Sequence, residues 1–176
     1  MNESRAPKIV YFLMLLMGAL QWVHTYPQLP DRMASHFDFY GRPNGWQPKE
    51  AFFLVIGGVI VVTGAIGFII PVALLAAPTE LINLPRKDYW LAPDRREETL
   101  RFLRARLEWF ACGVLFVLLY ASSQAINANL PGHGTFEAQE MLYVLAGFLL
   151  ITTGGTIHLL RHFYRVPPPN SIAGPR

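Results

Sequence analysis

Three histidines and one aspartate are the residues of this sequence best suited to ligand chemistry. His36 and Asp38 stand two positions apart in the run HFDFY, so their side chains would share one face of an extended strand. His24 and His133 occur in segments that are predicted below to lie at the same end of the molecule. Imidazole and carboxylate groups suit zinc, and histidine also titrates near neutral pH. Two interpretations stay open: a metal or proton-sensing cluster, or a His36 that bonds loop backbone beside an Asp38 that caps a turn.

A second group of charged and aromatic residues lies in RKDYWLAPDRREE, residues 86–98. One interpretation is an interfacial aromatic anchor surrounded by solvated ion pairs. The other is a docking site for a cytoplasmic protein, such as a repressor or an enzyme. The candidate docking residues are Lys87, Tyr89, Trp90, Arg95 and Arg96.

No catalytic signature accompanies these residues. The sequence has no nucleophile-elbow serine, phosphate loop, HExxH motif or paired cysteines, and its single Cys112 falls within a predicted span. We therefore expect no cofactor and favour a non-enzymatic function. An enzyme assembled from scattered residues stays open as an alternative.

Four long apolar runs must position all of these residues. The chain has 176 residues, of which 52% are apolar and 15% charged. Residues 51–77 contain no Asp, Glu, Lys or Arg, and a helix of that length rises about 40 Å, more than the ~30 Å of bilayer hydrocarbon. The sequence predicts an all-α membrane protein, one domain over residues 1–176, with four transmembrane helices at 9–26, 51–77, 109–127 and 141–160.

The distribution of positive charge predicts the orientation of these spans. The N-terminus, residues 78–107 and the C-terminal tail together hold twelve of the 15 Lys and Arg residues, whereas residues 27–50 hold three and residues 128–140 none. Because positive segments stay in the cytoplasm, both termini and residues 78–107 are expected there, and residues 27–50 outside. The basic balance follows from this topology and does not indicate nucleic-acid binding.

Residues 27–50 are expected to fold as a cap. Pro27 and Pro30 end the first helix, HFDFY has the alternation of a short strand, and GRPNG has the chemistry of a turn. We expect a folded extracytoplasmic loop, such as a hairpin laid over the helix ends. Three polar residues at the outer ends of the spans, Gln21, Gln124 and Asn127, are expected to hydrogen-bond to it or to line a shallow vestibule beneath it.

On the cytoplasmic side, residues 78–107 are expected to end in an amphipathic helix on the membrane surface that runs into the third span. Its apolar face is formed by Leu100, Leu103, Leu107 and Phe110. Glu108 opens the span and should pair with Arg104, one turn earlier. Residues 166–176 are predicted to form a flexible tail.

Stripes of small residues predict how the spans pack. Gly57, Gly64 and Pro71 recur every seven residues in the second span, and Gly147 and Gly154 have the same spacing in the fourth. Small residues let helix backbones approach closely in lipid, so these stripes are expected to be packing surfaces. A substrate path lined by glycine is the alternative interpretation.

The loop also resembles a known family. Its residues resemble the signature loop of small bacterial membrane proteins that share an N-terminal domain of unknown function with the SdpI immunity protein family. The residues that carry the resemblance are Leu29, Pro30, His36, Phe37, Gly41, Pro43, Asn44, Gly45, Trp46 and Lys49. Residues 83–100, NLPRKDYWLAPDRREETL, are similar to a second segment of relatives of about this length.

This resemblance implies a multi-pass protein of the bacterial inner membrane with the loop outside. For the SdpI branch it implies immunity to a secreted toxin, linked to a repressor held at the membrane; SdpI proteins are longer, with a second region that this sequence does not match. The candidate ligand-binding residues are His36, Asp38, Gly41, Asn44, Trp46 and Lys49.

The leading hypothesis is therefore a membrane protein that recognises an extracytoplasmic ligand or toxin peptide through residues 27–50 and relays this to a cytoplasmic regulator. One alternative is an accessory subunit of a larger membrane complex. Another is a small transporter or a metal-dependent membrane enzyme that uses His24, His36 and His133.

Overall fold

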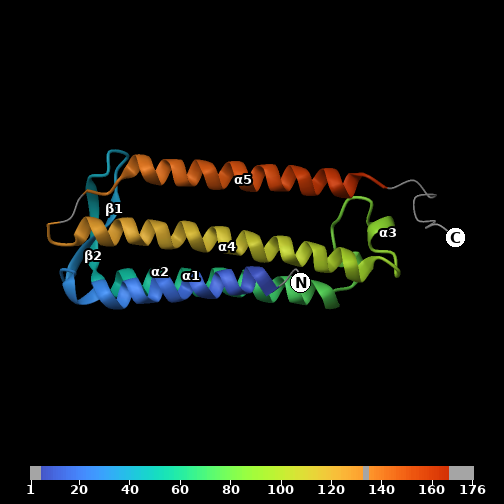
Figure 1. Ribbon diagram of the computed structural model, residues 1–176, viewed down its shortest axis with the longest axis horizontal. Helices are drawn as coiled ribbons and strands as arrows, with labels where there is room; N and C mark the ends of the chain where they lie inside the picture. The colour runs from blue at the N-terminus through green and yellow to red at the C-terminus, as the bar shows by residue number, and fades with distance from the viewer. Residues whose placement is uncertain (1–4, 133–134, 167–176) are drawn as a thin grey trace.

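Four long helices run side by side along the molecule (Figure 1). The computed structural model describes residues 5–132 and 135–166, and the helices are α1 (Arg5–Thr25), α2 (Lys49–Ala76), α4 (Arg96–Asn129) and α5 (Ala138–Tyr164). Each of the four is long and apolar enough to cross a membrane. The four helical spans predicted from hydropathy are therefore confirmed as helices.

Two structured connections close the ends of this bundle. At one end, the 3-10 turn η1 (Tyr26–Gln28) leads into strands β1 (Arg32–Phe37) and β2 (Pro43–Pro48). At the other end, η2 (Thr79–Leu81) and the short helix α3 (Lys87–Trp90) join α2 to α4. We call these the hairpin end and the α3 end; the first residues of α1 and the last residues of α5 point toward the α3 end (Figure 1).

Helices α1, α2 and α4 pack closely around a hydrophobic core near the middle of the bundle's length. The core residues are Tyr11, Ile60, Ala111, Cys112 and Leu115. Small residues of α2 permit this packing: a methyl group at Gly64, in the predicted stripe, would overlap the hydroxyl of Tyr11, and one at nearby Gly67 would overlap the side chain of Ala111. The predicted role of small residues as a packing surface is thus confirmed for the second span.

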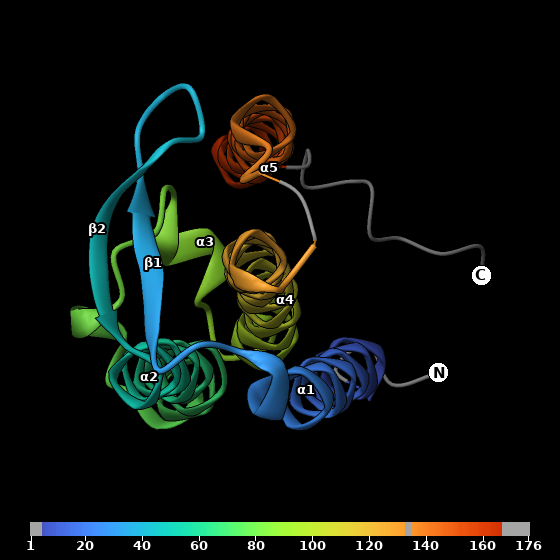
Figure 2. The same ribbon diagram turned by 90° about the vertical axis from the view of Figure 1, so that its left-hand side faces the viewer.

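The hairpin lies across the ends of the helices, roughly perpendicular to their axes (Figure 2). Strands β1 and β2 pair antiparallel, with an irregular register around His36. The sequence predicted a strand at 36–40 and a turn at 41–45, and both positions are wrong. The turn is Asp38–Arg42 because the Asp38 carboxylate accepts hydrogen bonds from the backbone N–H groups of Tyr40 and Arg42, and because Gly41 adopts φ +76°.

At the α3 end, residues 96–107 differ from the predicted surface helix. They form the first part of α4, which is one uninterrupted helix of 34 residues (Figure 1). Leu100 and Leu103 of the expected membrane-facing stripe pack against Ile82 and Leu91 of the connecting segment. Because the chain's own loop covers this end of the stripe, the helix continues in line with the span.

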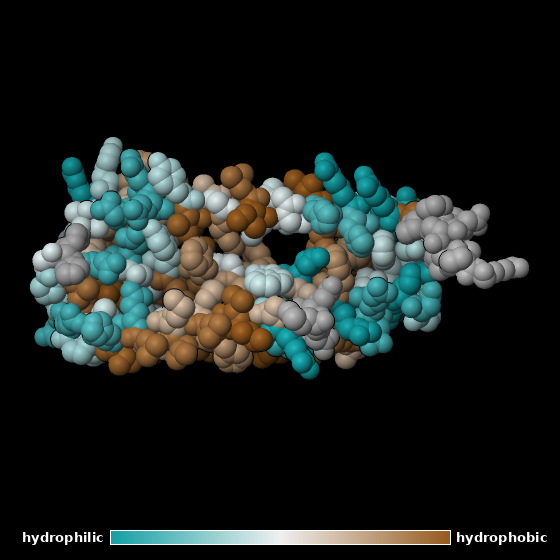
Figure 3. All heavy atoms as spheres, in the orientation of Figure 1, coloured by the Kyte–Doolittle hydropathy of each residue, from teal (hydrophilic) through white to brown (hydrophobic). Residues whose placement is uncertain are grey.

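Helix α5 stands apart from the other three. Phe148 contacts Gly113 and Phe110 of α4 near the middle of α5, yet no residue of the most apolar 18-residue window of α5 is buried. The space-filling view shows openings between α5 and the rest of the molecule (Figure 3). The glycine stripe of α5 does not pack inside the chain, since no atom lies within 4 Å of a methyl group placed at Gly147 or Gly154.

Candidate functional site

Asn129, the last residue of α4, joins strand β1 to the helices by side-chain hydrogen bonds. Its Oδ1 accepts a hydrogen bond from the Ala34 N–H at 2.8 Å, and its Nδ2 donates to the Ala34 carbonyl at 2.9 Å. Nδ2 also donates to the Ala125 carbonyl, one turn back in α4, at 2.7 Å. Ala34 is only 6% exposed, so this amide satisfies a backbone pair that is shielded from water.

Lys49 closes the loop at the start of α2. Its Nζ lies 3.3 Å from the Asp31 carboxylate, 3.4 Å from the Leu29 carbonyl oxygen and 5.1 Å from the centre of the Tyr26 ring. The Lys49 side chain is only 16% exposed. This predicted ligand-binding residue therefore has internal partners.

The hairpin also holds the start of α5. The rings of Phe37 and Phe136 stack with centroids 4.4 Å apart. Gly41 lies against the Phe136 carbonyl oxygen so closely that a methyl group there would overlap it. Together with its positive φ, this contact explains why position 41 requires glycine.

Six of the side chains exposed on the hairpin are aromatic, polar or cationic groups at or beside its turn, and we call them the exposed hairpin residues. Phe39, Tyr40 and Trp46 are 77%, 78% and 54% exposed. The Arg42 guanidinium lies 5.8 Å from the centre of the Tyr40 ring. The full set is His36, Phe39, Tyr40, Arg42, Asn44 and Trp46.

The six predicted ligand-binding residues thus divide into two groups. His36, Asn44 and Trp46 belong to the exposed set, whereas Asp38, Gly41 and Lys49 shape the loop. Prediction from sequence missed Phe39, Tyr40 and Arg42. The available signal was their place beside Gly41, because aromatic and arginine side chains at a turn are typical of recognition surfaces.

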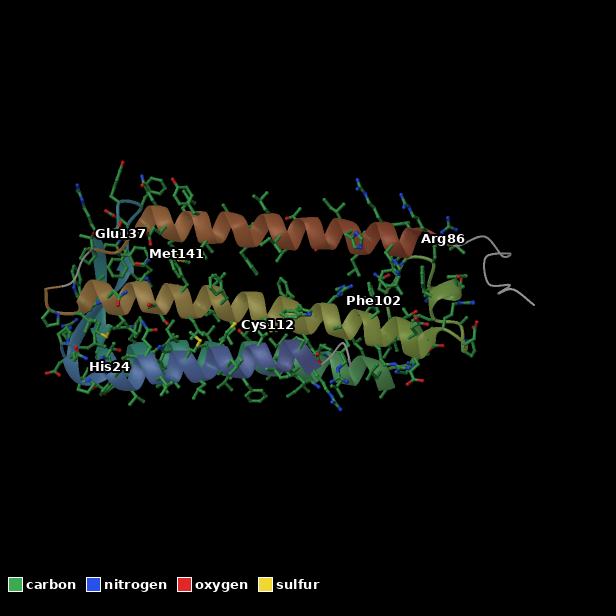
Figure 4. All side chains as sticks on the ribbon, in the orientation of Figure 1. His24, Arg86, Phe102, Cys112, Glu137 and Met141 are labelled. Atoms are coloured by element: carbon green, nitrogen blue, oxygen red, sulfur yellow. The ribbon has the colours of Figure 1, made fainter. Side chains whose placement is uncertain are left out.

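The predicted metal cluster is not assembled within the described part of the chain. Over residues 5–132 and 135–166, no group of three or more His, Cys, Asp or Glu side chains could hold a metal ion. His24 lies at the C-terminal end of α1 (Figure 4), while the His36 ring packs over Gly45 of the paired strand. His133 lies outside the described residues.

At the α3 end, the predicted docking arginines contact the protein itself. Arg96 donates to the carbonyls of Leu75 and Ala77 at 3.1 and 2.5 Å, so it caps the C-terminus of α2. Arg95 donates from Nε to the Tyr89 carbonyl at 2.9 Å and lies 4.2 Å from the centre of the Tyr89 ring.

Trp90 joins this connecting segment to the end of α5. Its Nε1 donates to the Phe163 carbonyl at 2.9 Å, and its ring lies 4.8 Å from that of His162. The ring of Phe102 of α4, labelled in Figure 4, stacks on the same His162 ring, with the ring centres 5.1 Å apart. Among the five predicted docking residues, only Lys87 is exposed, and the other four are half-buried.

Glu108 is buried where α1 meets α4. Its side chain is 0% exposed, and one oxygen accepts a hydrogen bond from Arg104 Nε at 2.8 Å. The same oxygen lies 3.9 Å from Lys8 Nζ. The predicted Arg104–Glu108 pair is therefore confirmed, and Lys8 adds a link to α1. One turn further along α4, Cys112 Sγ donates to the Pro7 carbonyl at 3.2 Å.

Two of the three polar residues predicted to support the hairpin, Gln21 and Gln124, bond to helix side chains instead. Gln21 donates to Ser123 Oγ at 2.7 Å, which joins α1 to α4. Gln124 donates to the Tyr120 hydroxyl and the Glu140 carboxylate at 2.8 and 3.1 Å. Asn127 is exposed. The residue that holds the hairpin, Asn129, was missed because nothing in its local sequence indicates a partner 95 residues earlier.

Comparison with known proteins gives one family match. Residues 9–60 match the model of a domain of unknown function, DUF1648. This range covers most of α1, the whole hairpin and the first part of α2. Neither the curated proteins nor the solved structures include one that matches the chain.

Proposed function

We propose that this is a multi-pass protein of the bacterial inner membrane that binds an extracytoplasmic peptide through its exposed hairpin residues. The termini and the α3 end would face the cytoplasm, in agreement with the distribution of Lys and Arg. The peptide would be a secreted toxin, as the resemblance to SdpI proteins suggests, and the protein would confer immunity.

One observation carries the proposal: large aromatic side chains are exposed on a hairpin whose backbone is held in place. Phe39, Tyr40 and Trp46 are all more than half exposed, although Asn129 and Lys49 fix the strands beneath them. A pre-ordered surface loses little conformational entropy on binding, and Trp, Tyr and Arg supply most of the binding energy at protein interfaces. An aromatic anchor at the membrane interface would need neither the rigid frame nor Arg42.

A survival assay tests this proposal. A strain sensitive to the SdpI-type killing factor would express the chain, Trp46→Ala, or the double variant Phe39→Ala with Tyr40→Ala. We expect the wild type to protect and each variant to lose protection by roughly 10-fold or more, since an interface aromatic contributes about 1.4–2 kcal/mol.

Tyr164→Ala is the matched control, because Tyr164 is 63% exposed but lies at the end of α5 remote from the hairpin. Its protection should equal that of the wild type at equal membrane abundance. Equal survival with and without the wild-type protein would rule out immunity to that toxin.

A second candidate function is that of an accessory subunit in a larger membrane complex. The unburied apolar surface of α5 favours it, because a partner would remove that surface from lipid contact. Purification in mild detergent should then recover a second protein in stoichiometric amount. A lone chain or a homodimer would contradict this alternative.

A further inference from the structure

A large apolar crevice separates α5 from α4. Its volume is about 1220 Å³, above the ~300–1,000 Å³ of typical small-molecule sites. The openings in Figure 3 lie along this crevice. Its middle is lined by Trp109, Phe110 and Phe116 of α4 and by Gly147, Ile151 and Gly154 of α5.

Helix α5 is held against the rest of the molecule at both ends and at one point between them, where the Phe148 ring lies against Gly113 and Phe110 of α4. At the hairpin end Phe136 stacks on Phe37, and at the α3 end Trp90 bonds the Phe163 carbonyl. Between these attachments α5 has its small residues facing the gap, since Gly147 and Gly154 both line it and have no neighbour within 4 Å of a methyl group. The Phe148 side chain, which contacts Gly113 and Phe110, therefore interrupts the gap partway along its length.

The charges that line the crevice lie toward the α3 end. Its wall contains the Arg106 guanidinium and the His158 imidazole, and no Asp or Glu among the described residues contributes to it. The Arg106 guanidinium lies 4.4 Å from the centre of the Phe102 ring and is free of ion pairs among the described residues. The hydroxyls of Thr152 and Thr156 donate to carbonyls of their own helix, so they add no free donor.

We propose that this crevice is a binding site for a phospholipid with an anionic headgroup. An acyl chain occupies the apolar gap between α4 and α5, and the headgroup meets Arg106 and His158 at the α3 end. The elongated apolar wall with one cationic end matches the chemistry of such a lipid. The occupant is a thin, flexible chain, which can pass around the Phe148 side chain where a straight helix in the gap would meet it.

Quenching of tryptophan fluorescence tests the proposal, because Trp109 lies in the crevice wall. The full chain is reconstituted in phosphatidylcholine vesicles that contain brominated phosphatidylglycerol, and in matched vesicles whose brominated lipid is phosphatidylcholine. The Trp109→Phe variant is measured in parallel, and the difference isolates the Trp109 signal. We expect about fivefold stronger apparent binding of phosphatidylglycerol, the factor that one arginine near an anionic headgroup contributes.

Two variants with matched controls locate the site. Arg106→Gln should abolish the preference for phosphatidylglycerol, whereas Arg101→Gln should keep it, since Arg101 pairs with Glu97 outside the crevice. Gly154→Leu should fill the gap and remove the preferential quenching. Gly58→Leu, which also has open space around it but lies on α2 outside the crevice, should leave the quenching unchanged.

Two results would overturn the proposal. Quenching of Trp109 that is equal for the two brominated lipids and proportional to their mole fractions would indicate ordinary contact with bulk bilayer. A Gly154→Cys variant in a Cys112→Ala background that forms stoichiometric disulfide dimers in the membrane would instead place a second copy of this chain at the crevice.

Discussion

Glu108 is a carboxylate that the fold removes completely from solvent, at the junction of α1 and α4. Its charge is balanced by Arg104 at 2.8 Å and by the more distant Lys8. A buried charge is tolerated only with such partners, so the three side chains act as a unit. Two other side chains also bond to distant backbone: Arg96 donates to the Ala77 carbonyl and Trp90 donates to the Phe163 carbonyl.

We predict that Glu108→Gln lowers the free energy of unfolding by roughly 1.5–3 kcal/mol, the contribution of a charged hydrogen bond, because Arg104 loses its counter-charge where it is only 18% exposed. Thermal unfolding in mild detergent would measure this. Glu97→Gln breaks the Arg101 pair, whose partners are 63% and 80% exposed, and should change the stability by no more than about 0.5 kcal/mol. Equal effects of the two variants would contradict the assigned role of Glu108.

Two glycines with positive φ, Gly41 and Gly132, allow a test of the contact between the hairpin turn and Phe136. Gly41→Ala and Gly132→Ala both impose a side chain at positive φ, at a cost of about 1–2 kcal/mol each. Only Gly41 also faces an obstacle, the Phe136 carbonyl oxygen, while a methyl group at Gly132 has open space. We therefore predict a clearly larger loss of thermal stability for Gly41→Ala. A loss no greater than that of Gly132→Ala would mean that the contact with Phe136 is unimportant.

At the scale of elements, the hairpin depends on α4 more than on its own two strands. A two-stranded hairpin alone is marginally stable in water, so its attachments decide whether it stays folded. Met33 and Ala34 of β1 are 0% and 6% exposed, and Asn129 bonds both backbone groups of Ala34. The rigid presentation of the exposed hairpin residues therefore originates in α4.

We predict that Asn129→Ala loosens residues 32–48, because it leaves the buried N–H and C=O of Ala34 unpaired at a cost of roughly 1–3 kcal/mol. Hydrogen exchange of peptides from this segment should become faster, while peptides from mid-α2 keep their protection. Asn127→Ala is the control, since Asn127 is exposed and should leave the exchange unchanged. Equal protection of residues 32–48 in both variants would show that Asn129 does not hold the strand.

The sequence predicted these elements with uneven success, for physical reasons. Apolar runs without charges locate helices well, and Pro27 and Pro30 located the end of the first one. The position of the turn was wrong because GRPNG has stronger turn chemistry than DFYGR, yet the Asp38 side-chain bonds and Gly41 close the chain earlier. Pro43 then begins β2, where a residue without an N–H is tolerated at the strand end.

Across the whole molecule, packing of the helices was predicted only in part. The stripe of α2 packs as expected, whereas the identical spacing in α5 faces the crevice. The spacing of small residues shows that one face of a helix is smooth, but it does not show which element packs against that face. In α5 the large Phe148 side chain, next to Gly147, makes the contact with α4 instead. For the candidate site, residue types indicated His36, Asn44 and Trp46, while contacts through space decided which neighbours are structural.

The orientation of the whole molecule in the membrane can be tested directly. Asn44→Cys and Lys87→Cys place exposed thiols at the two ends of the molecule, and the native Cys112 is buried. If the hairpin faces outward, a membrane-impermeant thiol reagent should label Asn44→Cys in intact cells and Lys87→Cys only after lysis. The reverse pattern would place the hairpin in the cytoplasm and rule out binding of any extracytoplasmic peptide there.

The bond between Asn129 and Ala34 has a consequence for biosynthesis, because its two ends are 95 residues apart in the chain. At ribosomal speeds of ~5–20 residues per second, roughly 5–20 s pass between the synthesis of Ala34 and that of Asn129. During that interval the nascent strands have only each other and the neighbouring helix ends as partners. Maturation of this surface is therefore a late event that follows the synthesis of α4.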